Sequence, residues 1–262
     1  MIDFIEHNIR ALFLDMDGVL WRDSEPIGNL PAIFTRISAL GLQVVLATNN
    51  ATQSVPQYID KLADFGVKLN ESQITTAGEA VVYHLREKYP EKTNVFVVGM
   101  DSLVAQIVSA GFTISNHGAR AVIVGVDRNI TYEKIRLASQ LIRDGAEFIG
   151  TNPDRTFPTP HGLVPGAGSI IAAVAAAAET EPRYAGKPDN ILMDLSFSRL
   201  SGITREQVLM VGDRPETDIA AGINFGCRTA LVLSGVTTEE IAHKCLPRPD
   251  FIFQDLTELL GA

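Results

Sequence analysis

Short apolar runs rich in β-branched residues recur along the chain, and a segment of helical periodicity follows each of them. Most of these helical segments stop at a glycine, as helices commonly do. A strand that is apolar throughout is buried on both faces of a sheet, and the helix after it returns the chain to begin a parallel neighbour. The sequence therefore predicts an α/β fold, with a parallel Rossmann-like core sheet and helices on both faces. The runs are "ALFLD" (11–15), "LQVVLATNN" (42–50), "VFVVG" (95–99), "RAVIVGVD" (120–127), "QVLMVGD" (207–213) and "RTALVLSG" (228–235).

The spacing of these units indicates one domain inserted into another. Lys187 comes 187 − 50 = 137 positions after the end of "ATNN", and the stretch between them has its own alternation of strands and helices. We expect a core domain of residues 1–76 plus 184–262 and an inserted α/β domain of residues 77–183. The stretch after Asp17, "GVLWRDSEPIGN", is too short to form a domain. The proline-rich stretch 151–168 is expected to be a long structured loop, and such loops often carry function.

Composition limits the partners of this chain. Its 262 residues include 22 Lys and Arg against 31 Asp and Glu, a net charge of −9, without a basic tract. This argues against nucleic acid and membrane surfaces, whose phosphates need clustered positive charge. The longest apolar run, 170–178, is short of the ~20 residues that span a bilayer. The first residues, "MIDFIEHNIR", lack the basic start and apolar stretch of a secretory signal. Cys227 and Cys245 have no metal-ligand spacing, so we expect a cytoplasmic protein with reduced cysteines.

Polar residues stand where three of the apolar runs end. In parallel α/β sheets, ligands bind beyond the carboxyl ends of the strands. An aspartate at one strand end is as readily a turn residue or a helix cap, so only the combination indicates a site. The residues concerned are Asp15 and Asp17, Thr48, Asn49 and Asn50, and Asp213, together with Asp218 five positions later and Lys187 in "AGKPD".

The order of these motifs resembles a known family. "DMDGVL", "ATNN", "GKPD" and "GDRPETDI" are similar, one after another, to motifs of the haloacid dehalogenase-like (HAD) phosphatases. The resemblance is to subfamily IIA, the NagD-like branch of nitrophenylphosphatases and phosphoglycolate phosphatases. "TNPDRTFP", "GLVPGAGSIIAA" and "LVLSGVTTEE" extend it over essentially the whole chain. One departure is Pro215-Glu216, where the branch more often has Leu-Asp; proline suits the first turn of a helix, so we expect unchanged chemistry.

The resemblance implies hydrolysis of phosphate esters through an aspartyl-phosphate intermediate. Asp15 would be the nucleophile. Asp17 would protonate the leaving oxygen and then accept a proton from water, which an alkoxide needs and a halide does not. The cofactor implied is Mg²⁺, which prefers oxygen donors. The other roles implied are metal binding by Asp15, Asp213 and the carbonyl of Asp17, orientation of metal-bound water or Lys187 by Asp218, and phosphate binding by Thr48, Asn49, Asn50 and Lys187.

The inserted domain resembles the type II cap of this branch, which implies that it selects the substrate. Asp154, Arg155 and His161 are the candidates for substrate contact, with stabilisation of the loop by turns as the alternative. The substrate expected is a small phosphorylated metabolite: 2-phosphoglycolate, pyridoxal phosphate, a nucleoside monophosphate, or a sugar or glycerol phosphate. The resemblance is compatible with a homodimer formed through the cap.

Two other functions fit the same residues. A phosphotransferase or phosphomutase would use the same aspartyl-phosphate and pass the phosphoryl group to another acceptor. A protein that only binds a phosphorylated ligand belongs to a different class, although every catalytic position is present in this chain.

Overall fold

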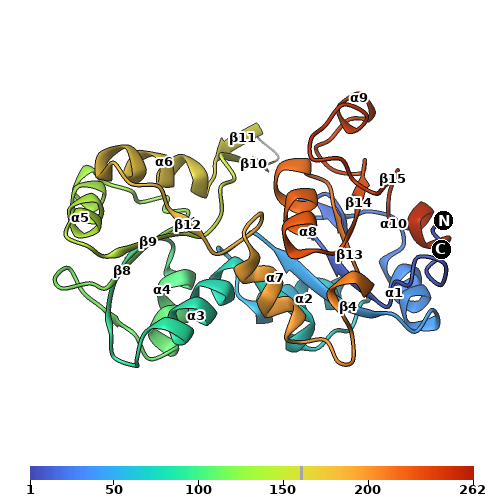
Figure 1. The fold of residues 1–262 in the computed structure, drawn as a ribbon, viewed down its shortest axis with the longest axis horizontal. Helices are drawn as coiled ribbons and strands as arrows, with labels where there is room; N and C mark the ends of the chain where they lie inside the picture. The colour runs from blue at the N-terminus through green and yellow to red at the C-terminus, as the bar shows by residue number, and fades with distance from the viewer. Residues whose placement is uncertain (160–161) are drawn as a thin grey trace. The chain divides into compact units, whose positions relative to one another are not determined.

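The computed structural model of the protein describes residues 1–159 and 162–262 and divides into two compact units, each built on its own sheet (Figure 1). The first unit comprises Met1–Thr48, Val55–Thr75 and Met193–Ala262. The second comprises Asn49–Ser54 and Thr76–Leu192. The predicted α/β class with a parallel core sheet is confirmed, and a second parallel sheet is present. Within the described residues, no helix combines the length and hydropathy needed to cross a bilayer.

The six-stranded sheet of the first unit places the N-terminal strand β1 in its interior. The strand pairs from β15 through to β4 are all parallel. Leu12 of β1 lies opposite Leu209 on one side and Val44 on the other. The carboxyl ends of β1, β13 and β4 therefore meet at one edge. In spatial order the strands are β15 (Phe251–Phe253), β14 (Arg228–Val232), β13 (Val208–Gly212), β1 (Ala11–Leu14), β4 (Gln43–Thr48) and β5 (Ile74–Thr76).

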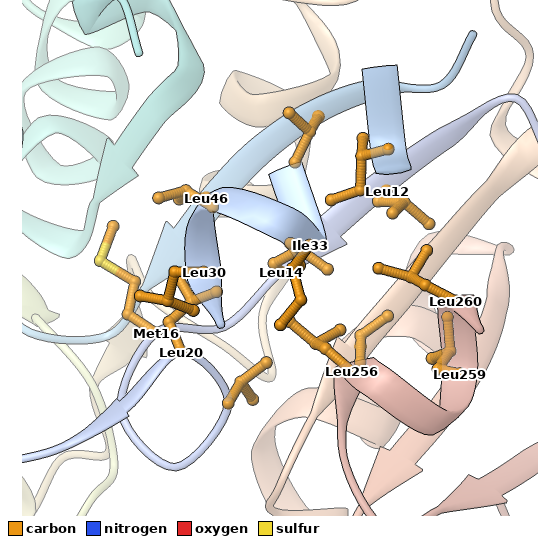
Figure 2. Close-up of a cluster of buried hydrophobic side chains, with 14 of the residues drawn as sticks. Leu12, Leu14, Met16, Leu20, Leu30, Ile33, Leu46, Leu256, Leu259 and Leu260 are labelled. Atoms are coloured by element: carbon orange, nitrogen blue, oxygen red, sulfur yellow. The ribbon is translucent and has the colours of Figure 1, made fainter. Parts of the chain in front are cut away.

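Helices cover both faces of this sheet. Successive side chains of a strand point to opposite faces, and because those of β1 are apolar and buried, both faces need a covering layer. Leu12 and Leu14 lie in a cluster with α1 (Leu30–Ala39) and α10 (Leu256–Leu260), as Figure 2 shows. Phe13 points the other way, with its ring 6.0 Å from that of Phe225 in α8 (Ala220–Phe225). Each leucine so buried contributes about 1.5–3 kcal/mol to the free energy of folding.

The remaining elements of the first unit are short. Helix α2 (Val55–Asp64) begins directly after Ser54, carries Pro56 in its first turn, where a missing N–H costs nothing, and is followed by Gly66 at φ +78°. The stretch after Asp17 forms a small antiparallel hairpin of β2 (Trp21–Arg22) and β3 (Glu25–Pro26). The others are η1 (Glu71–Gln73), α7 (Asn190–Phe197, which begins in the second unit), η2 (Arg205–Gln207), the π-helical turn η3 (Pro215–Ile219) and α9 (Glu239–Ala242).

The second unit has a five-stranded, fully parallel sheet. Its core packs Val122, Val124 and Phe148 against Ile142 and Ile171 from two helices. In spatial order the strands are β12 (Arg183–Tyr184), β9 (Glu147–Gly150), β8 (Ala121–Val124), β6 (Asn94–Val98) and β7 (Thr113–Ile114). The helices are α3 (Ala77–Lys88), α4 (Asp101–Ser109), α5 (Tyr132–Arg143) and α6 (Ala167–Ala178).

The stretch 151–168 is more regular than the sequence indicated. It contains the antiparallel strands β10 (Thr156–Thr159) and β11 (Gly162–Pro165), and α6 starts at its end. Prolines that indicate a loop are tolerated here because each strand of a two-stranded ribbon keeps a free edge, where no N–H donor is required.

Candidate active site

Three buried carboxylates gather at the carboxyl edge of the first unit's sheet. Asp15 directly follows β1 and Asp213 directly follows β13, and these strands are parallel neighbours. Asp218 belongs to the turn η3. One carboxylate oxygen from each of the three lies within 4.8 Å of the others. Two residues that are 198 positions apart in the chain are thus adjacent in the fold.

This donor set fits a divalent metal ion. Three carboxylates so close to one another repel, and burial removes the water that would otherwise screen them. A bound cation offsets both costs. All three donors are oxygen atoms, which suit hard cations rather than the thiophilic metals.

The turn η3 orients Asp218 through main-chain donors. Oδ2 of Asp218 accepts hydrogen bonds from the N–H groups of Asp213, at 3.1 Å, and Arg214, at 3.0 Å. Pro215 opens the turn, where its missing N–H costs nothing. The sequence predicted the start of a helix here. The structure begins it with a π-helical turn, a form often found at functional sites, which continues into α8.

The loop of residues 234–237, for which the sequence predicted no role, holds Asp213 in place. The N–H of Val236 donates to Oδ2 of Asp213 at 2.8 Å, and the hydroxyl of Thr237 donates to the Asp213 carbonyl. The hydroxyl of Ser234 donates to the carbonyl of Gly18 at 2.7 Å. The loop thereby connects the ends of β1 and β13. Its only sequence signal was the family-like stretch "LVLSGVTTEE".

Gly18 approaches the same carboxylate closely. Its φ is +86°, a conformation that L side chains rarely adopt. A Cβ atom at this position would lie 2.5 Å from Oδ2 of Asp213. Both the backbone conformation and the lack of space therefore require glycine here.

Asp17 is exposed, in contrast to the three clustered carboxylates. Its Oδ1 accepts a hydrogen bond of 2.8 Å from Nε1–H of Trp21, whose side chain is fully buried. The carboxylate thus has one oxygen fixed by a buried donor. Thr48, at the end of the neighbouring strand β4, is buried.

A second group of predicted residues lies together in the second unit. The side-chain amide of Asn49 accepts the N–H of Lys187 at 2.8 Å and donates to the Lys187 carbonyl at 3.1 Å. Asn49 Nδ2 also donates to Oδ2 of Asp154 at 3.2 Å, and Asn152 Nδ2 donates to the Asn49 carbonyl at 2.6 Å. Lys187 is only 1% exposed, and the two hydrogen bonds with Asn49 hold its main chain at this buried position.

The other residues singled out from the sequence have varied surroundings. Oδ1 of Asn50 accepts hydrogen bonds from N–H and Oγ1 of Thr52, at 2.8 and 2.7 Å. Arg155 is exposed, and its carbonyl accepts the N–H of Gly166 at 2.8 Å. His161 lies outside the described residues. Substrate contact by Asp154, Arg155 or His161 stays a prediction.

Comparison with known proteins decides the family. A model described as haloacid dehalogenase-like hydrolase matches residues 12–113, and one described as HAD-hydrolase-like matches residues 184–259. The sequence is 34% identical to a 5'-nucleotidase of Bacillus subtilis over 249 residues, which are 95% of this chain and 96% of that protein. The chain belongs to the haloacid dehalogenase-like hydrolases.

Further relatives place this HAD-like hydrolase among phosphatases. It is 33% identical to an acid sugar phosphatase of Staphylococcus epidermidis over 249 residues, 94% of this chain and 95% of that one. It matches the crystal structure of a 4-nitrophenylphosphatase from Thermotoga maritima with a TM-score of 0.91 and 32% identity, over 100% of this chain and 99% of that one. The HAD-like hydrolase is thus a phosphoric monoester hydrolase of the NagD-like, 4-nitrophenylphosphatase branch.

Proposed function

We propose that this HAD-like hydrolase cleaves small phosphate monoesters with the help of Mg²⁺, through an aspartyl-phosphate formed on Asp15. The observation that carries the proposal is the group of three buried carboxylates, Asp15, Asp213 and Asp218, which a bound dication would make tolerable. The exposed Asp17, two residues after the nucleophile, supplies the second carboxyl group that ester cleavage needs.

In the first step, a carboxylate oxygen of Asp15 attacks phosphorus and forms a new O–P bond. The bond from phosphorus to the leaving oxygen breaks, its electron pair goes to that oxygen, and Asp17 donates the proton. In the second step, a water oxygen attacks phosphorus and forms a new O–P bond, and the water gives one proton to Asp17. The bond from phosphorus to the Asp15 oxygen breaks, and its electron pair returns to the Asp15 carboxylate. Inorganic phosphate leaves and both carboxyl groups return to their starting states.

The charges of the phosphoryl group must be neutralised during both steps. Mg²⁺, when bound, supplies this neutralisation, and the proposed ligands are Asp15, Asp213 and the carbonyl of Asp17. Asp218 orients metal-bound water or Lys187. The donors proposed for the phosphoryl oxygens are the Thr48 hydroxyl, the main-chain N–H of Asn49, Asn50 and the Lys187 ammonium.

The substrate proposed is a small phosphorylated metabolite. The names of the relatives cover nucleotides, sugar phosphates and 4-nitrophenyl phosphate, a breadth that fits a shared phosphoryl site with a variable specificity region. We assign that region to a cap of residues 77–183, inserted in a core of 1–76 plus 184–262. A cytoplasmic location and a dimer formed through the cap stay predictions.

The decisive test is Asp15→Asn, a nearly isosteric change that removes the nucleophile. With Mg²⁺ and 4-nitrophenyl phosphate, we expect no phosphate release above background, while circular dichroism and the melting temperature stay close to those of the parent. A variant that hydrolyses the ester at the parent's rate would refute the nucleophile assignment. If the parent forms a phosphorylated acceptor and releases inorganic phosphate only slowly, the protein is a phosphotransferase.

A further inference from the structure

Trp21 is the one tryptophan of the chain and is completely buried. Its indole N–H points at a carboxylate that is exposed, Asp17, with 2.8 Å between Nε1 and Oδ1. Asp17 also makes a β-bridge with Trp21, and the N–H of Gly18 donates to the Trp21 carbonyl at 2.8 Å. Main chain and side chain together fix the two residues relative to each other.

The indole ring is itself held on its faces. The ring of Tyr58 stacks on it, with centroids 6.3 Å apart and 16° between the planes. Phe65 packs at 6.0 Å and a 38° angle. Nζ of Lys61 lies 4.0 Å from the ring centroid and donates to the carbonyl of Asp23 at 2.9 Å. A ring packed in this way cannot turn its N–H to another acceptor without disturbing several neighbours.

We propose that Trp21 is a positioning residue for the proton donor Asp17. The proposal rests on the proposed function, in which Asp17 protonates the leaving oxygen. A carboxylate or carbonyl oxygen accepts an N–H better than a hydroxyl oxygen does, so the indole favours Oδ1 as the oxygen without the proton and Oδ2 as the oxygen that carries it. In the transfer the Oδ2–H bond breaks, and the leaving oxygen takes the proton as its bond to phosphorus breaks.

A purely structural role for Trp21 makes a different prediction. A buried indole N–H needs an acceptor in any protein. If the hydrogen bond to Asp17 were only structural, removal of the N–H would lower stability and reduce the turnover of all esters alike. A positioning role makes the loss depend on the leaving group. 4-Nitrophenolate is stable enough to leave without a proton, whereas phenolate is a poorer leaving group and benefits from the acid.

The test compares kcat/KM for phenyl phosphate and 4-nitrophenyl phosphate with Mg²⁺ present, because kcat/KM reports the step in which the ester bond breaks. Trp21→Phe removes the N–H and keeps an aromatic ring. Because the chain has a single tryptophan, growth on 3-benzothienylalanine replaces the same N–H by sulfur in a ring of nearly the same shape. The controls are 5-fluorotryptophan, which keeps the N–H, and Phe253→Leu, which removes an aromatic ring that packs elsewhere against the same core cluster and stacks on Phe251.

We expect kcat/KM of both N–H-free proteins to fall roughly tenfold for phenyl phosphate and less than about twofold for 4-nitrophenyl phosphate. The larger loss is a part of the roughly 10²–10⁴-fold rate gain that a general acid typically gives. The controls should keep the parent's ratio between the two esters. Asp17→Asn should show the same selectivity as the N–H-free proteins, with a larger loss. Equal losses on both esters in the N–H-free proteins would overturn the role of Trp21. Equal losses in Asp17→Asn would overturn the acid assignment, and a parent inactive on both esters would overturn the proposed function itself.

Discussion

The side-chain amide of Asn49 spans the main chain of Lys187, accepting its N–H at 2.8 Å and donating to its carbonyl at 3.1 Å. The residue that follows strand β4 therefore fixes the position of a lysine that lies 138 positions later. Because the side chain is engaged in this way, only the main-chain N–H of Asn49 is proposed as a phosphate donor. In the proposed function, the Asn49 side chain would act on the site by positioning Lys187.

Asn49→Ala should lower kcat/KM for 4-nitrophenyl phosphate roughly tenfold and the free energy of unfolding by about 1–2 kcal/mol, because it removes two buried hydrogen bonds to Lys187. Steady-state kinetics and denaturant unfolding measure the two effects. The matched control is Asn29→Ala, which removes the N-cap bond to Ala32 and should cost about 1 kcal/mol with unchanged kinetics. Unchanged kinetics in both variants would show that Asn49 does not position the lysine.

Mg²⁺ should raise the melting temperature of the parent, because a ligand that binds only the folded state stabilises it, by about 2.7 kcal/mol at 100 times Kd. Chelation should stop turnover and added Mg²⁺ should restore it. In Asp213→Asn most of the stabilisation by Mg²⁺ should be lost, while the metal-free variant should be at least as stable as the metal-free parent, because one like charge is gone.

The control for this metal prediction is Asp250→Asn. Asp250 also accepts a main-chain N–H, from Thr229 at 2.8 Å, but it is not part of the carboxylate group. The rise in melting temperature on addition of Mg²⁺ should be the same in Asp250→Asn as in the parent. A parent that melts at the same temperature with and without Mg²⁺, and turns over after chelation, would contradict the metal site.

Gly18→Ala should impair the site more than the fold. The positive φ of this residue makes alanine cost about 1–2 kcal/mol, and the added Cβ must also displace the Asp213 carboxylate. Gly41 separates these effects, since its φ is +67° and no atom lies within 4 Å of its Cβ position. Calorimetry should find the backbone cost alone in Gly41→Ala and a larger loss in Gly18→Ala, whose Cβ would also meet Asp213 and Gly235. Mg²⁺ titration should find weakened binding in Gly18→Ala alone. Equal affinity in the two variants would mean that Asp213 tolerates the shift.

The stability of the second unit should depend on pH through Glu147. Partial burial raises the pKa of this carboxyl group, but hydrogen bonds from Lys88, Tyr89 and His84 outweigh it, so the pKa lies below its ordinary value of 4.5. The folded state therefore favours the ionised form, and the stabilisation is present above pH 4.5 and lost as the pH falls through the folded pKa.

Glu147→Gln should accordingly lower the free energy of unfolding at pH 7 by about 1 kcal/mol, allowing for solvent screening. The difference from the parent should shrink in denaturant titrations at pH values below 4.5. The control is Glu133→Gln, which breaks the exposed ion pair with Arg136. It should leave the free energy of unfolding unchanged both at pH 7 and in the acidic titrations. A difference that grows on acidification would contradict the assignment.

The general fold could be predicted because it depends on patterns within short segments. Apolar runs such as "VLMVG" give buried strands, and a polar residue directly after one must lie at the edge of the sheet. The meeting of Asp15 with Asp213 follows once β1 and β13 pair. The antiparallel pairing of β10 with β11 was not predicted, because the prolines of these strands favour a loop when the sequence is considered locally.

Contacts between distant side chains could not be predicted in this way. Nothing near Asn49 in the sequence indicates that its amide holds Lys187, and nothing near Val236 indicates that its N–H binds Asp213. The bond from Trp21 to Asp17 spans only four residues, yet it depends on a tight turn at Gly18 and on the packing of the indole against α2. Such contacts appear only when the segments are placed in space.

The position of β1 between β4 and β13 also bears on how the enzyme is made. During translation at 5–20 residues per second, roughly 10–40 s pass between the synthesis of residue 15 and that of residue 213. For that time the strand has β4 on one side and an unpaired edge on the other, where a second nascent chain or a chaperone can pair with it. The carboxylates of Asp15 and Asp213 can therefore come together only after β13 has been synthesised.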